Sequence, residues 1–124
     1  MENIKIKRFT DLQVWKEAHS LVLDVYKVTK NFPSEERFGL TNQMRRSAVS
    51  VPSNIAEGFG RNTAKDKAQF YSIAKGSLLE LQSQMYIAID LNFVEQKNMA
   101  NFNERIELTA RLISGLIKSA MNKI

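Results

Sequence analysis

The fold is most tightly constrained by residues 63–91, which read TAKDKAQFYSIAKGSLLELQSQMYIAIDL. Thr63 and Asp66 together are typical of a helix start, because the hydroxyl can accept a hydrogen bond from a free backbone N–H of the first turn. Apolar and small side chains then recur every three or four residues, which predicts one long helix ending near Leu91. Asn92 suits a left-handed C-terminal cap. The expected core face consists of Phe70, Ala74, Ser77, Leu78, Leu81, Met85 and Ala88.

The same helix carries a second row of small and apolar side chains on its opposite side. This outer row consists of Ser72, Gly76, Leu79, Ser83 and Tyr86, with Ile87 beside it. A helix that is apolar on two sides is usually buried on two sides, and small residues let another backbone approach closely. We interpret the outer row as a self-association surface. The alternative is that another helix of the same chain packs over it.

The chain before residue 63 shows two further helical patterns. A first helix should begin at Thr10, with Gln13 completing a capping box and Phe9 and Val14 forming a hydrophobic staple, and should end before Pro33. Its two apolar rows are Leu12, Trp15, His19, Val22, Tyr26 and Thr29, and Val14, Ala18, Leu21, Val25, Val28 and Phe32. A second helix over residues 40–59 should survive Pro52 with a kink. Its core side consists of Leu40, Met44, Ala48, Val51, Ile55 and Phe59.

After a connection at residues 93–98, the last part of the chain predicts a fourth helix. Its apolar side consists of Phe102, Ile106, Thr109, Ile113, Leu116 and Ala120. No strand-like alternation occurs, and the connections are short. The sequence therefore predicts an all-α, up-down four-helix bundle that forms a single domain over residues 1–124.

The second helix also carries a polar row that is unusually poor in long charged side chains. This row consists of Gln43, Ser47, Ser50, Asn54, Glu57 and Arg61. Short amides and hydroxyls indicate a partly buried surface, either a packed interface or a channel wall, whereas the alternative is an ordinary surface of low charge. We assign Gln43, Ser50 and Asn54 to a contact between subunits, and we expect Glu57 to pair with Arg61 one turn later.

Basic residues outnumber acidic ones, with 18 Lys and Arg against 13 Asp and Glu and a net charge of +5. A local cluster follows the second helix into the third, and its candidate nucleic-acid-binding residues are Arg45, Arg46, Arg61, Lys65 and Lys75. Arginine forks suit phosphate groups. The alternative for the nearby glycines Gly58 and Gly60 is a simple turn between helices. The aromatic residues Trp15, Tyr26, Phe70 and Phe102 are expected to pack in the core.

Cysteine is absent and His19 is the single histidine. These residues do not supply the ligands of a zinc site or the partner of a catalytic nucleophile, so we expect no enzyme, no metal and no cofactor. The charged N-terminus and the shortness of uncharged runs predict a cytoplasmic protein that does not interact with membranes.

Five ordered segments carry a resemblance to a known family. They are FTDLQVWK at 9–16, FGLT at 38–41, QMRRSA at 43–48, PSNIAEG at 52–58 and AKGSLLEL at 74–81. Together they resemble the four-helix-bundle proteins encoded within 23S rRNA intervening sequences, over residues 9–94. Asn92 stands where the family usually has glycine, and Ser47 stands where alanine is commoner.

This resemblance implies a ring-shaped homopentamer and a relationship to the accessory variability proteins of diversity-generating retroelements, which join a reverse transcriptase and RNA. The family's arginine pair falls on Arg45 and Arg46. We therefore expect a homo-oligomeric bundle whose basic surface binds RNA or DNA, or docks a nucleic-acid enzyme. The alternative is a protein-interaction scaffold whose basic residues only aid solubility.

Overall fold

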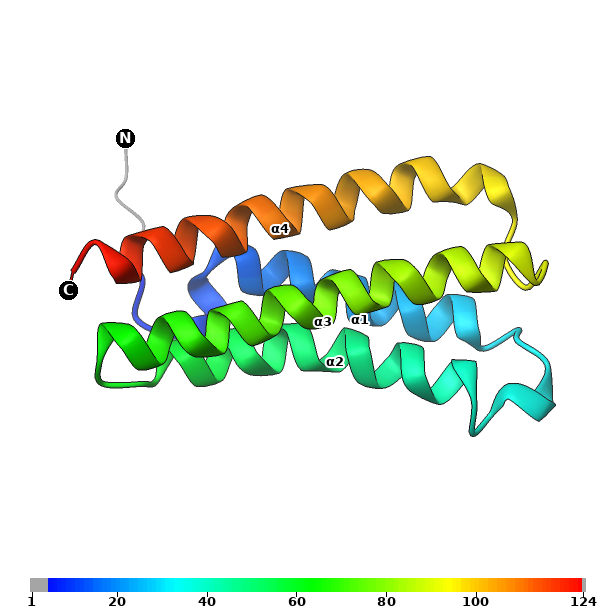
Figure 1. The fold of residues 1–124 in the computed structure, drawn as a ribbon, viewed down its shortest axis with the longest axis horizontal. Helices are drawn as coiled ribbons and strands as arrows, with labels where there is room; N and C mark the ends of the chain where they lie inside the picture. The colour runs from blue at the N-terminus through cyan, green and yellow to red at the C-terminus, as the bar shows by residue number, and fades with distance from the viewer. Residues whose placement is uncertain (1–4, 124) are drawn as a thin grey trace.

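The computed structural model describes residues 5–123, in which four long helices run alternately up and down (Figure 1). The helices are α1 (Gln13–Thr29), α2 (Leu40–Phe59), α3 (Ala64–Asp90) and α4 (Met99–Met121). Short 3₁₀ turns, η1 (Phe9–Asp11), η2 (Ser34–Glu36) and η3 (Gln96–Asn98), precede α1, α2 and α4. The described residues contain no strand, so the predicted all-α class and the four helices are confirmed.

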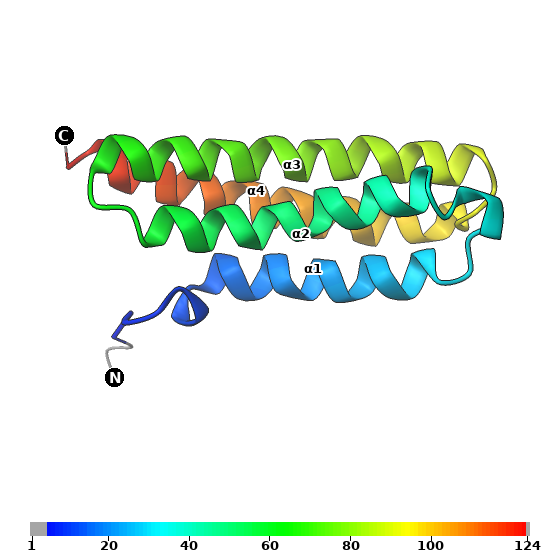
Figure 2. The same cartoon turned by 90° about the horizontal axis from the view of Figure 1, so that it is seen from below.

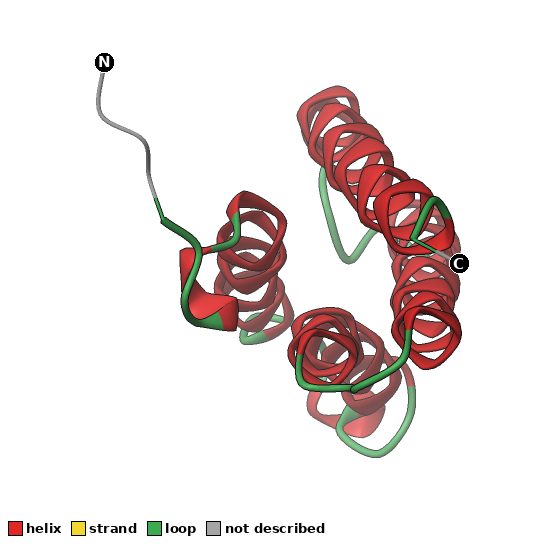
Figure 3. Ribbon diagram, turned by 90° about the vertical axis from the view of Figure 1, so that its left-hand side faces the viewer, coloured by secondary structure: helices red, strands yellow, loops and turns green. Residues whose placement is uncertain are grey.

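Each helix packs against its neighbour along the chain (Figures 2 and 3). α1 also contacts α4. The α2–α3 contact is the most extensive of these, and the α1–α4 contact is the smallest. Arg105 of α4 forms an ion pair with Asp24 of α1, and its Nη2 donates to Ser20 Oγ at 2.9 Å. These polar contacts join α1 and α4, the pair of helices with the least extensive packing.

The start of α1 differs from the predicted capping box. Thr10 lies inside the 3₁₀ turn, and α1 begins at Gln13 without a side-chain cap. Asp11 provides the local hydrogen bonds instead, because its Oδ2 accepts from the backbone N–H groups of Arg8 and Lys7, both at 3.0 Å. These two bonds lower the pKa of the Asp11 carboxyl. The predicted cap at Thr10 is therefore wrong, since an aspartate one residue later closes a tighter turn.

Phe9 contacts Trp15 edge-on at a centroid distance of 5.6 Å, and the staple with Val14 stays a prediction. Val14 is buried in the core, whereas Phe9 is 36% exposed. The 3₁₀ turn therefore places the Phe9 ring against the apolar row of α1 that contains Trp15.

The predicted bounds of α2 and the predicted cap of α3 are confirmed. α2 runs unbroken through Pro52, and Glu36 Oε1 accepts from the Leu40 N–H at 3.1 Å, in the first turn. Thr63 Oγ1 accepts from the Asp66 N–H at 3.1 Å. Asn92, just after α3, has a φ of 65°, which is the expected left-handed cap.

The core forms where the four predicted apolar faces meet. Its largest fully buried side chains include Leu21, Met44, Ile55, Leu78, Leu81, Ile106 and Ile113. Several predictions fail at its edge. Tyr26 is 43% exposed. Phe59 and Phe70 are only partly buried and lie outside the core, and the Arg61 guanidinium lies over the Phe70 ring at 4.5 Å. Tyr71, which lies outside the predicted core face, is buried. Because α3 contacts both α2 and α4, its buried face is wider than one row and includes Tyr71. None of the helices described is long and apolar enough to cross a membrane.

Candidate nucleic-acid interface

Arg45 and Arg46 lie in the second turn of α2, on the side that faces α1 and solvent. The Arg45 guanidinium lies over the Tyr26 ring of α1 at 4.5 Å, and its Nε donates to Thr29 Oγ1 at 2.9 Å. These two contacts fix the guanidinium between the helices. Arg46 is exposed. Within residues 5–123 neither arginine forms an ion pair, so both positive charges remain available to an anionic partner.

A groove lies on each side of Arg46. The first, of about 500 Å³, is lined by Tyr26, Asn42, Arg45, Arg46, Val49 and Ser50. The second, which we call the α2–α3 groove, has about 510 Å³ and is lined by Phe38, Asn42, Gln43, Arg46, Ser47, Ser50, Ser77, Glu80 and Gln84. We call Arg45, Arg46 and the two grooves the paired-arginine surface. It combines guanidinium, amide and aromatic groups, which are the groups that proteins use to bind nucleic acids.

The remaining predicted basic residues lie elsewhere in the subunit. Arg61 is 16 residues beyond Arg45, or about 24 Å along a helical axis at 1.5 Å per residue, and it forms an ion pair with Glu57 at 3.2 Å. Lys65 is exposed in the first turn of α3, and Lys75 Nζ donates to Ser114 Oγ of α4 at 2.9 Å. In the single subunit these side chains lie apart from Arg45 and Arg46, and Arg61 and Lys75 have partners of their own. Their assignment to nucleic-acid binding stays a prediction.

The middle of the polar row of α2, at Ser47 and Ser50, packs against α3 of the same chain, whereas Gln43, Glu57 and Arg61 of this row are exposed. Ser50 Oγ and Ser77 Oγ are 2.8 Å apart, and Ser47 Oγ donates to Glu80 Oε2 at 3.2 Å. Asn54 Nδ2 donates to the Ser50 carbonyl oxygen at 2.9 Å. Ser50 and Asn54 thus have partners within the chain, and their assignment to a contact between subunits stays a prediction. Gln43 is exposed at the edge of the α2–α3 groove.

The outer row of α3 faces solvent along its whole length. Ser72, Gly76, Leu79, Ser83 and Tyr86 are all exposed or half-buried, and the exposed fractions of Leu79 and Tyr86 are 51% and 47%. The Tyr86 hydroxyl accepts from Asn103 Nδ2 of α4 at 2.9 Å. The alternative that a helix of the same chain covers this row is therefore excluded.

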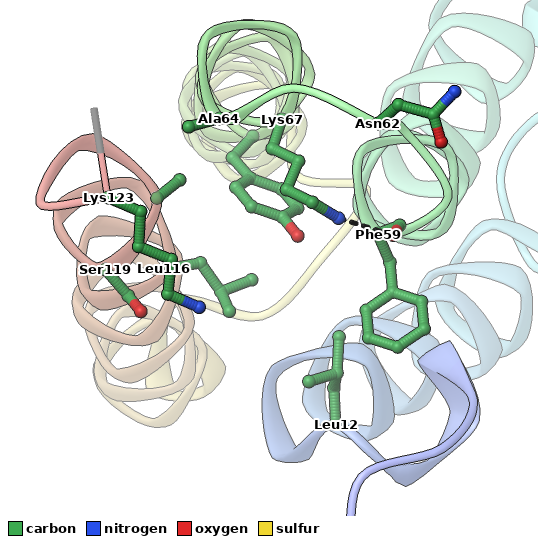
Figure 4. Close-up of a pocket in the computed structure, with 10 residues that line it drawn as sticks. Leu12, Phe59, Asn62, Ala64, Lys67, Leu116, Ser119 and Lys123 are labelled. Carbon is green, nitrogen blue, oxygen red and sulfur yellow. Dashed lines mark hydrogen bonds between the residues drawn. The ribbon is translucent and has the colours of Figure 1, made fainter.

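A further pocket of about 410 Å³ lies at the end of the bundle, between the start of α1 and the ends of α2 and α4 (Figure 4). Lys67 Nζ donates to the Phe59 carbonyl oxygen at 2.7 Å, and this bond offsets the negative end of the α2 dipole. Leu12 and Leu116 lie on other walls of the pocket (Figure 4). Burial raises the pKa of the Tyr71 hydroxyl, which also lines it. Lys67 thus has a structural partner already.

Sequence reasoning missed Phe38 and Tyr26 as members of the candidate site. Phe38 is 86% exposed, beside Gly39 and outside the helices, so no helical pattern applies to it. Tyr26 continues an apolar row of α1, and that row alone predicts a core position for it. The signal that could have identified Tyr26 is its place near the end of the helix, next to Thr29, where the neighbouring helix supplies Arg45.

Comparison with known proteins places this fold in a family. The sequence model described as 23S rRNA-intervening sequence protein matches residues 10–115. No curated protein matches the chain. The match covers all of α1, α2 and α3 and most of α4. The chain therefore belongs to the 23S rRNA-intervening sequence protein family.

Proposed function

We propose that this protein is a non-enzymatic, self-associating four-helix bundle that binds the phosphate backbone of RNA or DNA through the paired-arginine surface. The observation that carries this proposal is the arrangement of Arg45, whose guanidinium is held by Tyr26 and Thr29 rather than by a carboxylate. A guanidinium that is already positioned loses less conformational entropy when it binds phosphate. Arg46 adds a second, exposed charge at the next position of α2.

Self-association would strengthen this binding. A subunit presents only two unpaired arginines on this surface, but each copy in an assembly would repeat them, so that a moderate net charge of +5 per chain becomes a concentrated field. The exposed outer row of α3 supports association, because Leu79, Tyr86 and Ile87 leave a large apolar surface in water. The family resemblance implies a homopentamer.

A second candidate function is a protein-interaction scaffold that binds no nucleic acid, including one that docks a nucleic-acid enzyme. Three basic side chains near the second and third helices already have partners within the chain, which favours the scaffold. Arg61 pairs with Glu57, Lys75 donates to Ser114, and Lys67 donates to the carbonyl oxygen of Phe59 at the end of α2. In this case Arg45 and Arg46 would contact a carboxylate-bearing protein instead of phosphate.

Salt-dependent binding distinguishes the two functions. Fluorescence anisotropy with labelled single-stranded and double-stranded RNA and DNA should show affinity that falls steeply between about 50 and 200 mM salt. The variant R45Q/R46Q should weaken binding to every sequence and reduce the slope of log K against log salt by about 0.7–0.9 for each phosphate that the variant no longer binds. The matched control is R111Q/K118Q, which removes the same charge from exposed positions of α4 and should bind nearly as the wild type does.

Two results would contradict the proposal. One is the absence of binding by the wild-type protein at the lowest salt concentration, and the other is equal binding by R45Q/R46Q and wild type. Because Arg45 also contacts Tyr26 and Thr29, thermal unfolding followed by circular dichroism should accompany the titrations. R46Q alone removes an exposed charge without these contacts, so it provides a test that does not depend on the packing of Arg45.

A further inference from the structure

We infer that the α2–α3 groove holds one unpaired, amino-bearing base of a single-stranded nucleic acid, with guanine as the best fit. The inference rests on the proposed function, because Arg46 belongs both to the groove and to the proposed phosphate-binding surface. It adds a binding site for a base to a surface that otherwise recognises only the backbone.

The groove has the size of a small-ligand site and a mostly polar lining. Its volume of about 510 Å³ falls within the roughly 300–1,000 Å³ that is common for such sites. Eight of its nine lining residues are polar or charged, and Phe38 is the exception. The hydrogen bonds of Ser50 with Ser77 and of Ser47 with Glu80 hold the two helices together along the groove. All lining residues except Phe38 therefore lie on the two packed helices rather than on a loop.

The side chains of α3 offer hydrogen-bond acceptors to the groove. Among the described residues, Gln84 Oε1 is buried and has no hydrogen-bond partner. Glu80 lies one turn earlier on the same face of α3, and Ser47 donates to one of its carboxylate oxygens. Because Gln84 Oε1 is inaccessible as the side chain lies, a ligand N–H reaches it only when the side chain rotates toward the groove, and this rotation would remove the cost of a buried acceptor without a donor.

An unpaired base can provide these donors. Proteins that recognise single strands commonly bind the Watson–Crick edge of a base through side-chain amides and carboxylates. Guanine presents an imino N–H and an amino group side by side on this edge, which fits the acceptors of Glu80 and Gln84. Uracil presents a single N–H between two carbonyl oxygens, so it would place acceptors against acceptors.

Phe38 provides an exposed ring at the same groove. It is 86% exposed, and the Arg37 guanidinium lies over the ring at 5.6 Å from its centroid. Exposed aromatic rings commonly stack with unpaired bases. A base between Phe38 and the α3 acceptors would leave its phosphate close to Arg46, whose positive charge offsets that of the Glu80 carboxylate.

The test uses four RNA heptamers: one of uridine alone, and three with guanosine, adenosine or cytidine at the centre of a uridine chain. The wild-type protein should bind the guanosine heptamer about tenfold more tightly than the uridine heptamer, as expected for one correctly paired base edge. F38A and E80Q should each remove most of this preference and keep the salt dependence. R45Q/R46Q should instead weaken binding to all four heptamers.

Q84M distinguishes a role of Gln84 in base binding from a role in stability alone, because two quantities are measured: the preference for guanosine and the melting temperature. It removes the unpartnered acceptor, so the preference for guanosine should fall while the melting temperature stays the same or rises. The matched controls are L23A, an exposed apolar truncation on α1, and E107Q, which removes an exposed charge from α4. Both should keep the wild-type preference.

Four results would overturn the inference. If the four heptamers bind equally, or if F38A, E80Q and Q84M keep the wild-type preference, the groove does not receive a base. Salt-dependent binding that R45Q/R46Q abolishes would still support the proposed function in these two cases. If F38A changes the oligomeric mass, the groove is a contact between subunits. If the wild type binds no heptamer at low salt, the proposed function fails and the inference fails with it.

Discussion

At the scale of single residues, Gly58 shows how closely α2 and α3 are packed. A Cβ atom at this position would lie 2.7 Å from Cε1 and 2.9 Å from Cδ1 of Tyr71. Tyr71 is 3% exposed, so its ring has little free space into which to move. The sequence indicated Gly58 only as part of a possible turn, because a close approach between helices leaves no pattern along one chain. The contact is a close approach of α2 and α3 near the end of α2, beyond the α2–α3 groove.

We expect G58A to destabilise the protein. Alanine normally favours a helix interior over glycine by up to about 1 kcal/mol, but here the clash with Tyr71 should outweigh this gain by about 1–3 kcal/mol, as in other overpacked cores. The matched control is G115A in α4, where an added Cβ meets no atom within 4 Å, and it should stabilise the protein by about 0.5–1 kcal/mol. Urea unfolding measures both changes. A stabilised G58A would show that the ring moves away freely.

At the scale of helices, local sequence signals predicted most boundaries. The bounds of α2 followed from the periodicity of residues 40–59, and Thr63 capped α3 as its spacing with Asp66 indicated. The prediction at Thr10 failed because Asp11, one position later, offers a competing acceptor that closes a 3₁₀ turn. Local signals thus suffice where one cap is available and fail where two adjacent side chains compete.

The end of α3 gives a test at this scale. Asn92 has a φ of 65°, and the following Phe93 N–H donates to the Ala88 carbonyl oxygen at 2.9 Å. N92V should cost about 1–2 kcal/mol, because a Cβ-branched side chain clashes with the backbone in the left-handed conformation. N92G should change stability by less, since glycine adopts this conformation without strain. Chemical denaturation of the two variants should give this order. Equal stabilities would mean that the end of α3 has rearranged.

The basic residues of the candidate site were less predictable than the helices. Arg45 and Arg46 are adjacent in sequence and remain together on α2. Arg61 and Lys75 counted toward the same local charge, although the helical rise and direction separate them from the arginine pair. The charge along the sequence therefore identified the adjacent arginines Arg45 and Arg46 as a candidate site. Only the packing of α1 beside α2 reveals Tyr26 and Thr29 as partners of Arg45.

At the scale of the whole molecule, the bundle buries one side of α3 and leaves the other side apolar and exposed. Leu78 and Leu81 are fully buried, whereas Leu79 is 51% exposed and Ile87 47% exposed. The sequence predicted that α3 is apolar on two sides, but it did not distinguish a second helix of the chain from a second copy of the chain. Because no helix among the described residues covers the outer row, the question becomes one of assembly.

L79D tests whether the outer row joins subunits. A charge introduced in a buried contact between copies is strongly unfavourable, whereas at an exposed position of a single subunit it should change stability by about 0.5 kcal/mol or less. The matched control is L23D on α1, since Leu23 and Leu79 are both 51% exposed. Light scattering at micromolar concentration should give an oligomer for the wild type and L23D and a mass closer to 14.2 kDa for L79D. Circular dichroism should show the same helicity for all three proteins. A monomeric wild type would contradict self-association. An unchanged oligomer in L79D would place the contact on another surface, because an aspartate within an apolar interface must either lose its hydration or separate the subunits.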